Sequence, residues 1–134
     1  MAGTIVADTI QDGAGNSTSM DNAIYGSAKA WVTFTYISSV LTTTASYNVS
    51  SVTRSAVGQY SVTMTNALVD ANYAVVMGGG PATGQTQPSN THPHYNVATG
   101  GYITPTTTVF SLGIVNEQNS SQVDPYTMAI VVHR

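Results

Sequence analysis

Only 7% of the 134 residues are charged, against about 25% in an average soluble domain, so hydroxyls and amides must cover most of the surface. With a formal net charge of −3 and only Lys29, Arg54 and Arg134 as fixed cations, the chain cannot neutralise a run of phosphates, which argues against nucleic acid and anionic membranes as partners. The absence of cysteine excludes disulfides, thiolate nucleophiles and cysteine zinc sites.

The first 28 residues are predicted to form an extended attachment arm. TIVADTI, residues 4 to 10, could pair as a short strand, and QDGAGNSTSMDNAIYGS after it is rich in turn formers and small polar residues. Such an arm can add a strand to the sheet edge of a partner, with Ile5, Val6 and Ile10 filling pockets. Residues 29 to 134 are expected to form one knob domain.

From residue 29 onward the dominant hydrophobic period is two, the period of a half-buried strand. Short strands separated by polar turns predict an all-β fold, a small antiparallel β-sandwich or barrel. The expected strands, with their inward side chains, are 29–36 (Val32, Phe34, Tyr36), a hairpin over about 49–65 with its turn at 55–58 (Tyr60, Val62, Met64), 73–77, 108–115 (Phe110, Leu112, Ile114) and 126–133 (Tyr126, Met128, Ile130, Val132).

Aromatic side chains are assigned mainly to the core. Tyr36, Tyr60 and Tyr126 fall on the alternating apolar faces, so core packing explains them better than sugar stacking. Trp31 is either a core residue between the sheets or a plug in a trimer interface, and we favour the core.

Residues 78 to 96, GGGPATGQTQPSNTHPHYN, are predicted to form a long loop, and long ordered loops usually contact something. Tyr95 and Tyr102, near this loop, are the candidate ligand contacts. His92 and His94 would point the same way in an extended segment, and copies around a trimer axis could hold a metal ion. We favour exposed loop histidines instead, and expect no metal and no cofactor.

Carboxylates offer no catalytic pattern. All six are scattered over turns and the arm, without a calcium loop or a close acid pair, and are expected to be solvated: Asp8, Asp12, Asp21, Asp70, Glu117 and Asp124. Asp70 is expected to close the turn before the strand at 73 through its side chain. Phosphate-loop and nucleophile-elbow motifs are also missing, so we predict no catalytic residue and no enzyme.

Three segments, GSAKAWVTFTY (26–36), SYNVSSVTRSAVGQYSVTMT (46–65) and DANYAVV (70–76), resemble a recurrent module in virion proteins of tailed bacteriophages. The shared pattern is A-W-V-x-F, then S-[YF]-N-V-S-S-[VI], G-x-Y-x-V and D-A-N-Y, in this order. The resemblance implies a small all-β domain, commonly a homotrimer, on the outside of the virion. The flank ISSVLTTTA and the stretch from 78 to 96 depart from the module.

The function expected from these features is association. The first hypothesis is a homotrimeric capsid decoration, or cement, protein that assembles in the host cytoplasm and braces the major capsid protein, or another virion protein, at the phage surface. The alternative is a tail-fibre or tail-tip protein that binds host glycans. A stalk with heptads or β-helix repeats, which a whole fibre would need, is absent from the sequence.

Overall fold

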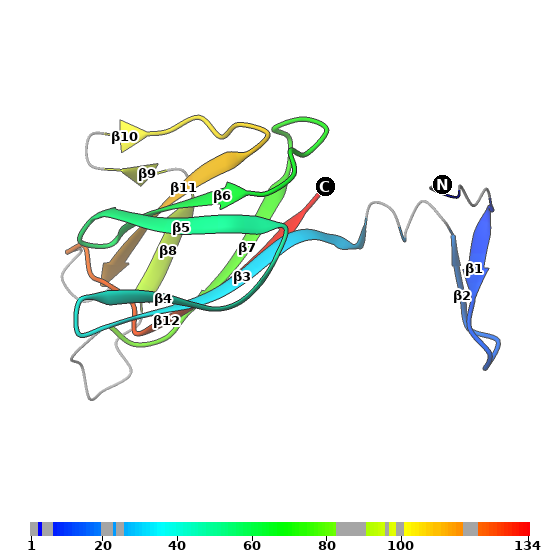
Figure 1. Cartoon of the computed structure of the whole chain (residues 1–134), viewed down its shortest axis with the longest axis horizontal. Coiled ribbons are helices and arrows are strands. Elements are labelled where there is room, and N and C mark those ends of the chain that lie inside the picture. Colours follow the sequence, from blue (N-terminus) through cyan, green and yellow to red (C-terminus); the bar gives the residue numbers. More distant parts are fainter. Residues whose placement is uncertain are drawn as a thin grey trace.

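Two four-stranded antiparallel sheets form the body of the protein (Figure 1). The structure is a computed structural model that describes residues 3, 7–19, 23, 26–82, 91–95, 97–98, 101–116 and 121–134, with the backbone alone at 91, 92, 95, 97, 98, 101 and 102. The strands are β1 (Thr9–Gln11), β2 (Ser17–Ser19), β3 (Ala28–Ile37), β4 (Val40–Tyr47), β5 (Val49–Ala56), β6 (Gln59–Met64), β7 (Ala74–Gly79), β8 (Thr91–Tyr95), β9 (Val97–Ala98), β10 (Gly101–Tyr102), β11 (Val109–Asn116) and β12 (Thr127–His133).

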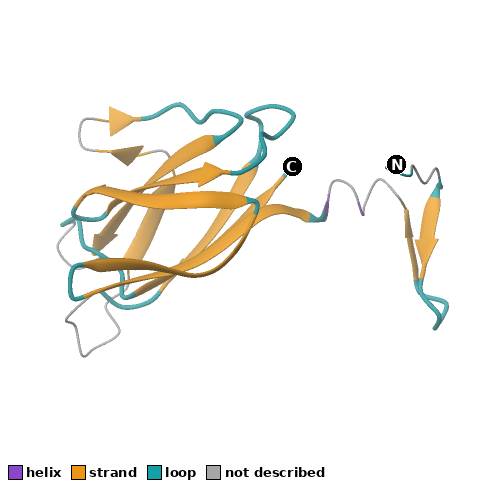
Figure 2. Cartoon of the chain, viewed as in Figure 1, coloured by secondary structure: helices purple, strands orange, loops and turns teal. Residues whose placement is uncertain are grey.

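The sheets have the strand orders β4-β3-β12-β7 and β5-β6-β11-β8, and they pack face to face as a β-sandwich. Two further pairs, β1-β2 and β9-β10, form small two-stranded sheets (Figure 2). The predicted all-β class and antiparallel sandwich are confirmed.

Between the sheets lies one apolar core, built from alternate residues of four central strands. The predicted inward faces are confirmed for the following residues, each at most 3% exposed: Val32, Phe34, Tyr60, Val62, Met64, Phe110, Leu112, Ile114, Met128, Ile130 and Val132. The period-two pattern thus identified the residues that hold the sheets together.

Two aromatic assignments to the core are wrong. Trp31 is 37% exposed because it alternates with the buried Ala30 and Val32 and so lies on the outer face of its sheet. Tyr126 is 48% exposed. It precedes β12, which begins at Thr127, and therefore lies outside the alternation of that strand. Tyr36 is partly buried.

Strand β4 was not foreseen, because TTTASY at its centre and end has no apolar alternation to signal it. A tight turn at Ser38 and Ser39, with φ of 51° and 65°, folds β4 back onto β3. Two successive left-handed residues are the signature of a two-residue hairpin turn. The predicted hairpin of β5 and β6 is confirmed, with its turn at Val57 and Gly58.

Asn48 turns the chain from one sheet to the other, between β4 and β5. Its φ is 52°, a left-handed conformation that asparagine tolerates well. Its side-chain oxygen accepts from the Asn66 amide at 2.8 Å, and its Nδ2 donates to the Lys29 carbonyl at 3.0 Å. These bonds give a physical reason for the asparagine within SYNVSS.

The long loop expected from 78 to 96 is shorter than predicted. Strand β7 continues to Gly79, and residues 91 to 95 form β8, which pairs with β11. β8 is the edge strand of its sheet. A proline is tolerated there, at Pro93, because an edge strand has one side with no neighbouring strand and so needs no N–H donor on that side. Residues 83 to 90 and 96 lie outside the described residues.

Part of the N-terminal arm folds back on itself. β1 and β2 pair with Thr9 opposite Ser19, and Asp12 closes the turn by accepting from the Ala14 and Asn16 amides, each at 2.9 Å. This hairpin stands apart from the sandwich (Figure 1). The arm therefore contains a small folded element.

Candidate functional site

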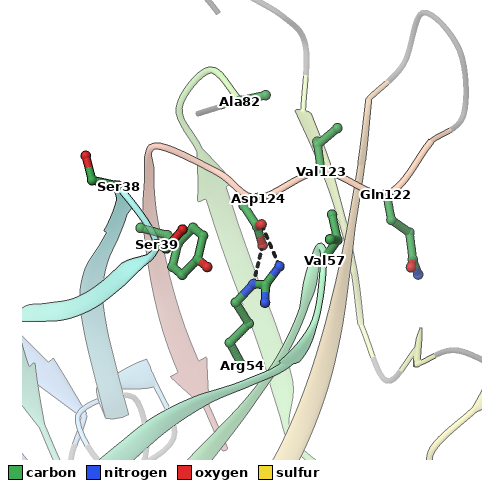
Figure 3. A pocket seen from close by; sticks show the side chains of 9 residues that line it. Ser38, Ser39, Arg54, Val57, Ala82, Gln122, Val123 and Asp124 are labelled. Carbon is green, nitrogen blue, oxygen red and sulfur yellow. Dashed lines mark hydrogen bonds and ion pairs between the residues drawn. The ribbon is translucent and has the colours of Figure 1, made fainter. Parts of the chain in front are cut away.

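The turns of the sandwich gather at one end around a pocket of about 460 Å³ (Figure 3). The turn from β3 to β4, the turn from β5 to β6 and the segment that leads into β12 all contribute to it. Its lining combines hydroxyls, an amide, one cation and one anion: Tyr36, Ser38, Ser39, Arg54, Val57, Ala82, Gln122, Val123 and Asp124.

At the floor of this pocket, Arg54 and Asp124 form a two-pronged ion pair. Nε donates to Oδ1 and Nη2 to Oδ2, both at 2.8 Å. The two side chains are 25% and 13% exposed. The paired geometry matches the planar guanidinium to the planar carboxylate, which makes it stronger than a single contact.

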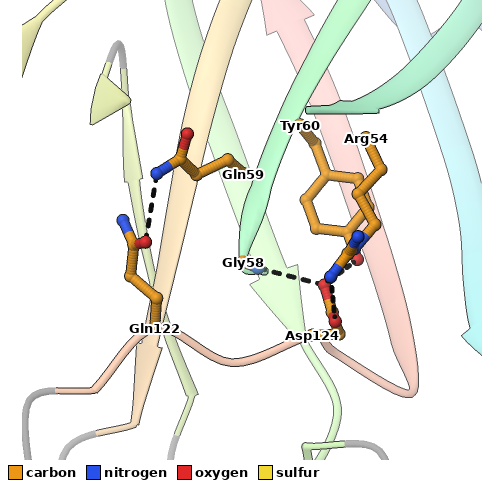
Figure 4. A network of polar contacts seen from close by, with 6 residues as sticks. All are labelled: Arg54, Gly58, Gln59, Tyr60, Gln122 and Asp124. Carbon is orange, nitrogen blue, oxygen red and sulfur yellow. Dashed lines mark hydrogen bonds and ion pairs between the residues drawn. The ribbon is translucent and has the colours of Figure 1, made fainter. Parts of the chain in front are cut away.

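Asp124 also binds the turn between β5 and β6 (Figure 4). Its Oδ1 accepts from the Gly58 amide at 3.0 Å and from the Tyr60 hydroxyl at 2.7 Å. Gly58 has φ of +66°, and an added Cβ would lie 2.5 Å from the Ile114 carbonyl oxygen. Only glycine fits this turn without a shift of the backbone.

The surroundings set the protonation of these groups. Burial alone would raise the pKa of Asp124, but hydrogen bonds from Arg54, the Gly58 amide and Tyr60 outweigh it and hold the pKa below its ordinary value. Burial, and then the bond to the Asp124 carboxylate, raises the pKa of Tyr60 far above its ordinary value. The hydrogen bond to Asp124 also raises the pKa of Arg54. The pair is therefore fully charged near neutral pH.

Aromatic rings and an amide pair complete the cluster. The guanidinium of Arg54 lies 4.8 Å from the centroid of the Tyr36 ring, which in turn meets Tyr60 edge-on at 6.4 Å. Gln59 donates to the Gln122 side chain at 3.0 Å. Of these groups, Tyr36 contacts the ion pair through the guanidinium of Arg54, and Tyr60 contacts it through its bond to Asp124.

Chemically, this arrangement suits binding and structure rather than acid–base catalysis. An aspartate with a lowered pKa, already bonded to an arginine, a tyrosine and a backbone amide, is a poor proton carrier at neutral pH. The described lining of the pocket holds no second carboxylate. The hydroxyls of Ser38 and Ser39 and the amide of Gln122 can exchange hydrogen bonds with a polar ligand.

The expectation that all the carboxylates are solvated is wrong for Asp124, which is mostly buried in this ion pair. Asp70 does close its turn as predicted, by accepting from the Asn72 amide at 2.8 Å, and it also pairs with Arg134. No local signal links the partners of the two pairs, because they lie 70 and 64 residues apart in the sequence.

The predicted site residues do not meet in one place. Ile10 lies on β1, is 45% exposed and lines a hollow of about 350 Å³ on the arm hairpin. Ile5 and Val6 lie outside the described residues. The backbone of Tyr95 is in β8 and that of Tyr102 in β10, two different sheets, and their side chains lie outside the description.

His94 is exposed on β8, and the side chain of His92 lies outside the description. The described residues contain no cluster of three or more histidine and acidic side chains that could hold a metal ion. No helix in the described part of the chain is long and apolar enough to cross a membrane.

Comparison with protein-family models, with curated proteins and with solved structures finds no match for this chain. The resemblance to bacteriophage virion modules therefore stays a prediction from the sequence motifs.

Proposed function

We propose that this protein is a non-enzymatic structural protein of a bacteriophage virion, a capsid decoration protein that binds the major capsid protein through its N-terminal arm. The observation that carries the proposal is the β1–β2 hairpin, which stands apart from the sandwich (Figure 1). The sequence motifs supply the virion context, and the resemblance implies three copies per assembly.

A detached hairpin has a physical reason to seek a partner. Two strands of three residues each are marginally stable in water, because they bury little apolar surface. Ile10 is 45% exposed on this hairpin and is available to fill a pocket in another protein. Docking on a sheet edge would satisfy the open backbone groups of β1 or β2 and order the arm.

Multivalency turns such a small contact into firm attachment. Several arms joined through their knobs bind one shell together, so the release of one arm is reversed at a high effective concentration. The knob supplies a stable body, since the Arg54–Asp124 pair and the core hold the two sheets together in a chain without cysteine.

Deleting residues 1–24 tests this proposal. The deletion ends before β3 and removes no residue of the sandwich, so we expect a folded knob that no longer binds shells. Ile10→Asp in the full chain should weaken shell binding at least tenfold, whereas the exposed control Val69→Asp should leave it unchanged. Undiminished binding by the truncated protein would place the contact on the knob and refute the arm proposal.

A tail-fibre or tail-tip protein that binds host glycans is the second candidate. The polar pocket at the end of the sandwich favours it, because hydroxyls, an amide and a charged pair can bind a sugar by hydrogen bonds. Under this alternative the protein binds host cells, and Val57→Trp, which would fill the pocket, abolishes the binding while the 1–24 deletion does not.

A further inference from the structure

The outer faces of the two sheets differ in how far the chain covers them. On the β5-β6-β11-β8 sheet, β9 lies against β11, and the outward Ser111 is only 6% exposed and bonded to Ser61 at 3.0 Å. On the β4-β3-β12-β7 sheet, the corresponding outward residues Trp31 and Val76 remain 37% and 60% exposed. The first face is thus covered by the chain itself at β11, and the second face is open.

A row of large apolar side chains crosses the open face from edge to edge. Tyr47 is opposite Trp31, Trp31 is opposite Val131, and Val131 is opposite Val76. Cross-strand partners point to the same face of a sheet, so these four side chains form one continuous ridge over all four strands. Tyr47 is 58% exposed, and Val131 is partly buried between its neighbours.

A row of small side chains runs beside this ridge. Ala45 is opposite Thr33, Thr33 is opposite Ala129, and Ala129 is opposite Gly78. Three of these four residues are exposed, and Thr33 is partly buried. Alanine, threonine and glycine are smaller than the tryptophan, tyrosine and valines of the ridge, so this lower row, the groove, runs parallel to the ridge. Neither row contains a charged residue.

We propose that this face is a self-association surface, with the ridge around Trp31 of one copy seated in the groove around Thr33 of another copy. A second copy fits because a ridge and a groove of equal length lie side by side on the same face, so the face carries its own complement. Because the contact uses the same face on both copies, it joins knobs in pairs. It goes beyond the proposed function, whose three-copy assembly would use a different surface.

The size of the face suits such a contact. Four strands about 4.8 Å apart and about seven residues long, at roughly 3.3 Å per residue, present roughly 400 Å² of flat sheet per copy. Side chains make the accessible surface of each face larger than this flat area. Two such faces together therefore reach the roughly 1,000 Å² of buried area that a specific interface needs. The two rows also combine Trp31 on a central strand with an absence of charge, as the core of an interface does.

Charge does not oppose the contact. Residues 29–134 contain three cations, Lys29, Arg54 and Arg134, and three anions, Asp70, Glu117 and Asp124, so this part of the chain has no formal net charge. The net charge of −3 comes from Asp8, Asp12 and Asp21 in the arm. Knobs can therefore approach one another without net repulsion while the arms carry the negative charge.

The test is the mass of the full chain in solution, measured by size exclusion with light scattering over two decades of concentration. We expect a dimer, with twice the 13.9 kDa chain mass. Thr33→Arg should raise the dissociation constant about a hundredfold or more, because it would bury an uncompensated charge in the contact. Thr53→Arg is the matched control, since Thr53 is an exposed strand threonine on the other sheet, and it should leave the mass unchanged.

Trp31 gives an independent readout, because it is the one tryptophan in the sequence. Its emission should shift to the red when the oligomer dissociates on dilution, and in Thr33→Arg at all concentrations. A monomeric wild-type chain at the highest concentration, or an oligomer whose mass Thr33→Arg leaves unchanged, would overturn the proposal. These measurements contain no shells, so they are independent of whether the arm binds a capsid.

Discussion

Arg54 and Asp124 are 70 residues apart in the sequence, yet two hydrogen bonds of 2.8 Å join their side chains. The pair ties β5 to the segment that leads into β12, and these two strands belong to different sheets. It therefore links the sheets at the end where the turns gather, outside the apolar core.

Asp124→Asn should destabilise the protein by about 2–4 kcal/mol, because it leaves the half-buried Arg54 without its counter-charge. Urea unfolding followed by circular dichroism measures the loss. Asp70→Asn is the control, since Asp70 and Arg134 are 34% and 30% exposed and their pair should matter less. Equal losses in the two variants would show that the Arg54 pair has no special role in joining the sheets.

The contribution of Asp124 should depend on pH in one direction. Because its pKa is lowered in the folded protein, its contribution is complete above the ordinary aspartate pKa of 3.8 and is lost as the pH falls through the folded-state value. The difference in unfolding free energy between wild type and Asp124→Asn should therefore be constant from about pH 7 to pH 5 and shrink below about pH 4. A difference that grows toward acid would contradict the assigned ion pair.

Gly58→Ala should cost more than about 2 kcal/mol, since the new Cβ would meet backbone atoms of both neighbouring segments. The distances are 2.5 Å to the Ile114 oxygen and 2.9 Å to the Val123 nitrogen, at a φ of +66°. Gly13→Ala is the control, because nothing lies within 4 Å of its added Cβ. Thermal unfolding distinguishes them, and a wild-type melting temperature for Gly58→Ala would mean that this turn adopts another conformation.

Two tyrosines that the sequence pattern treats alike should respond differently to truncation. Tyr60 is 1% exposed and packs on Phe34 with ring centroids 5.2 Å apart, so Tyr60→Ala should cost about 3–5 kcal/mol. Tyr126 is 48% exposed, and Tyr126→Ala should change stability by less than about 1 kcal/mol. Chemical denaturation measures both, and the reverse order would mean that the assigned faces are inverted.

The core was predictable because it depends on local alternation. Tyr60, Val62 and Met64 lie in a run where apolar and polar residues alternate, and the buried face follows directly from that period. The turn at Gly58 was also visible, since glycine ends the short segment SAVG ahead of the next strand.

Features that depend on pairing between distant segments were not predictable. The sequence gives no local sign that Asp124 meets Arg54, because each residue alone resembles a solvated charge. β4 was missed for a related reason: as an exposed edge strand it needs no apolar face, and its pairing with β3 is set by the turn at Ser38 and Ser39. We assigned Trp31 to the core because a large apolar side chain is usually buried. In β3 the buried residues are Ala30 and Val32, so the side chain of Trp31 lies on the outer face of the sheet.

The central claim is that this protein attaches to a virion shell through its arm, and co-sedimentation with phage heads that lack it tests that claim most directly. Host cells serve as the parallel binding target. The account predicts saturable binding to heads, at a fixed number of copies per shell, with no binding to cells. Binding to cells alone would contradict it and identify a receptor-binding protein instead.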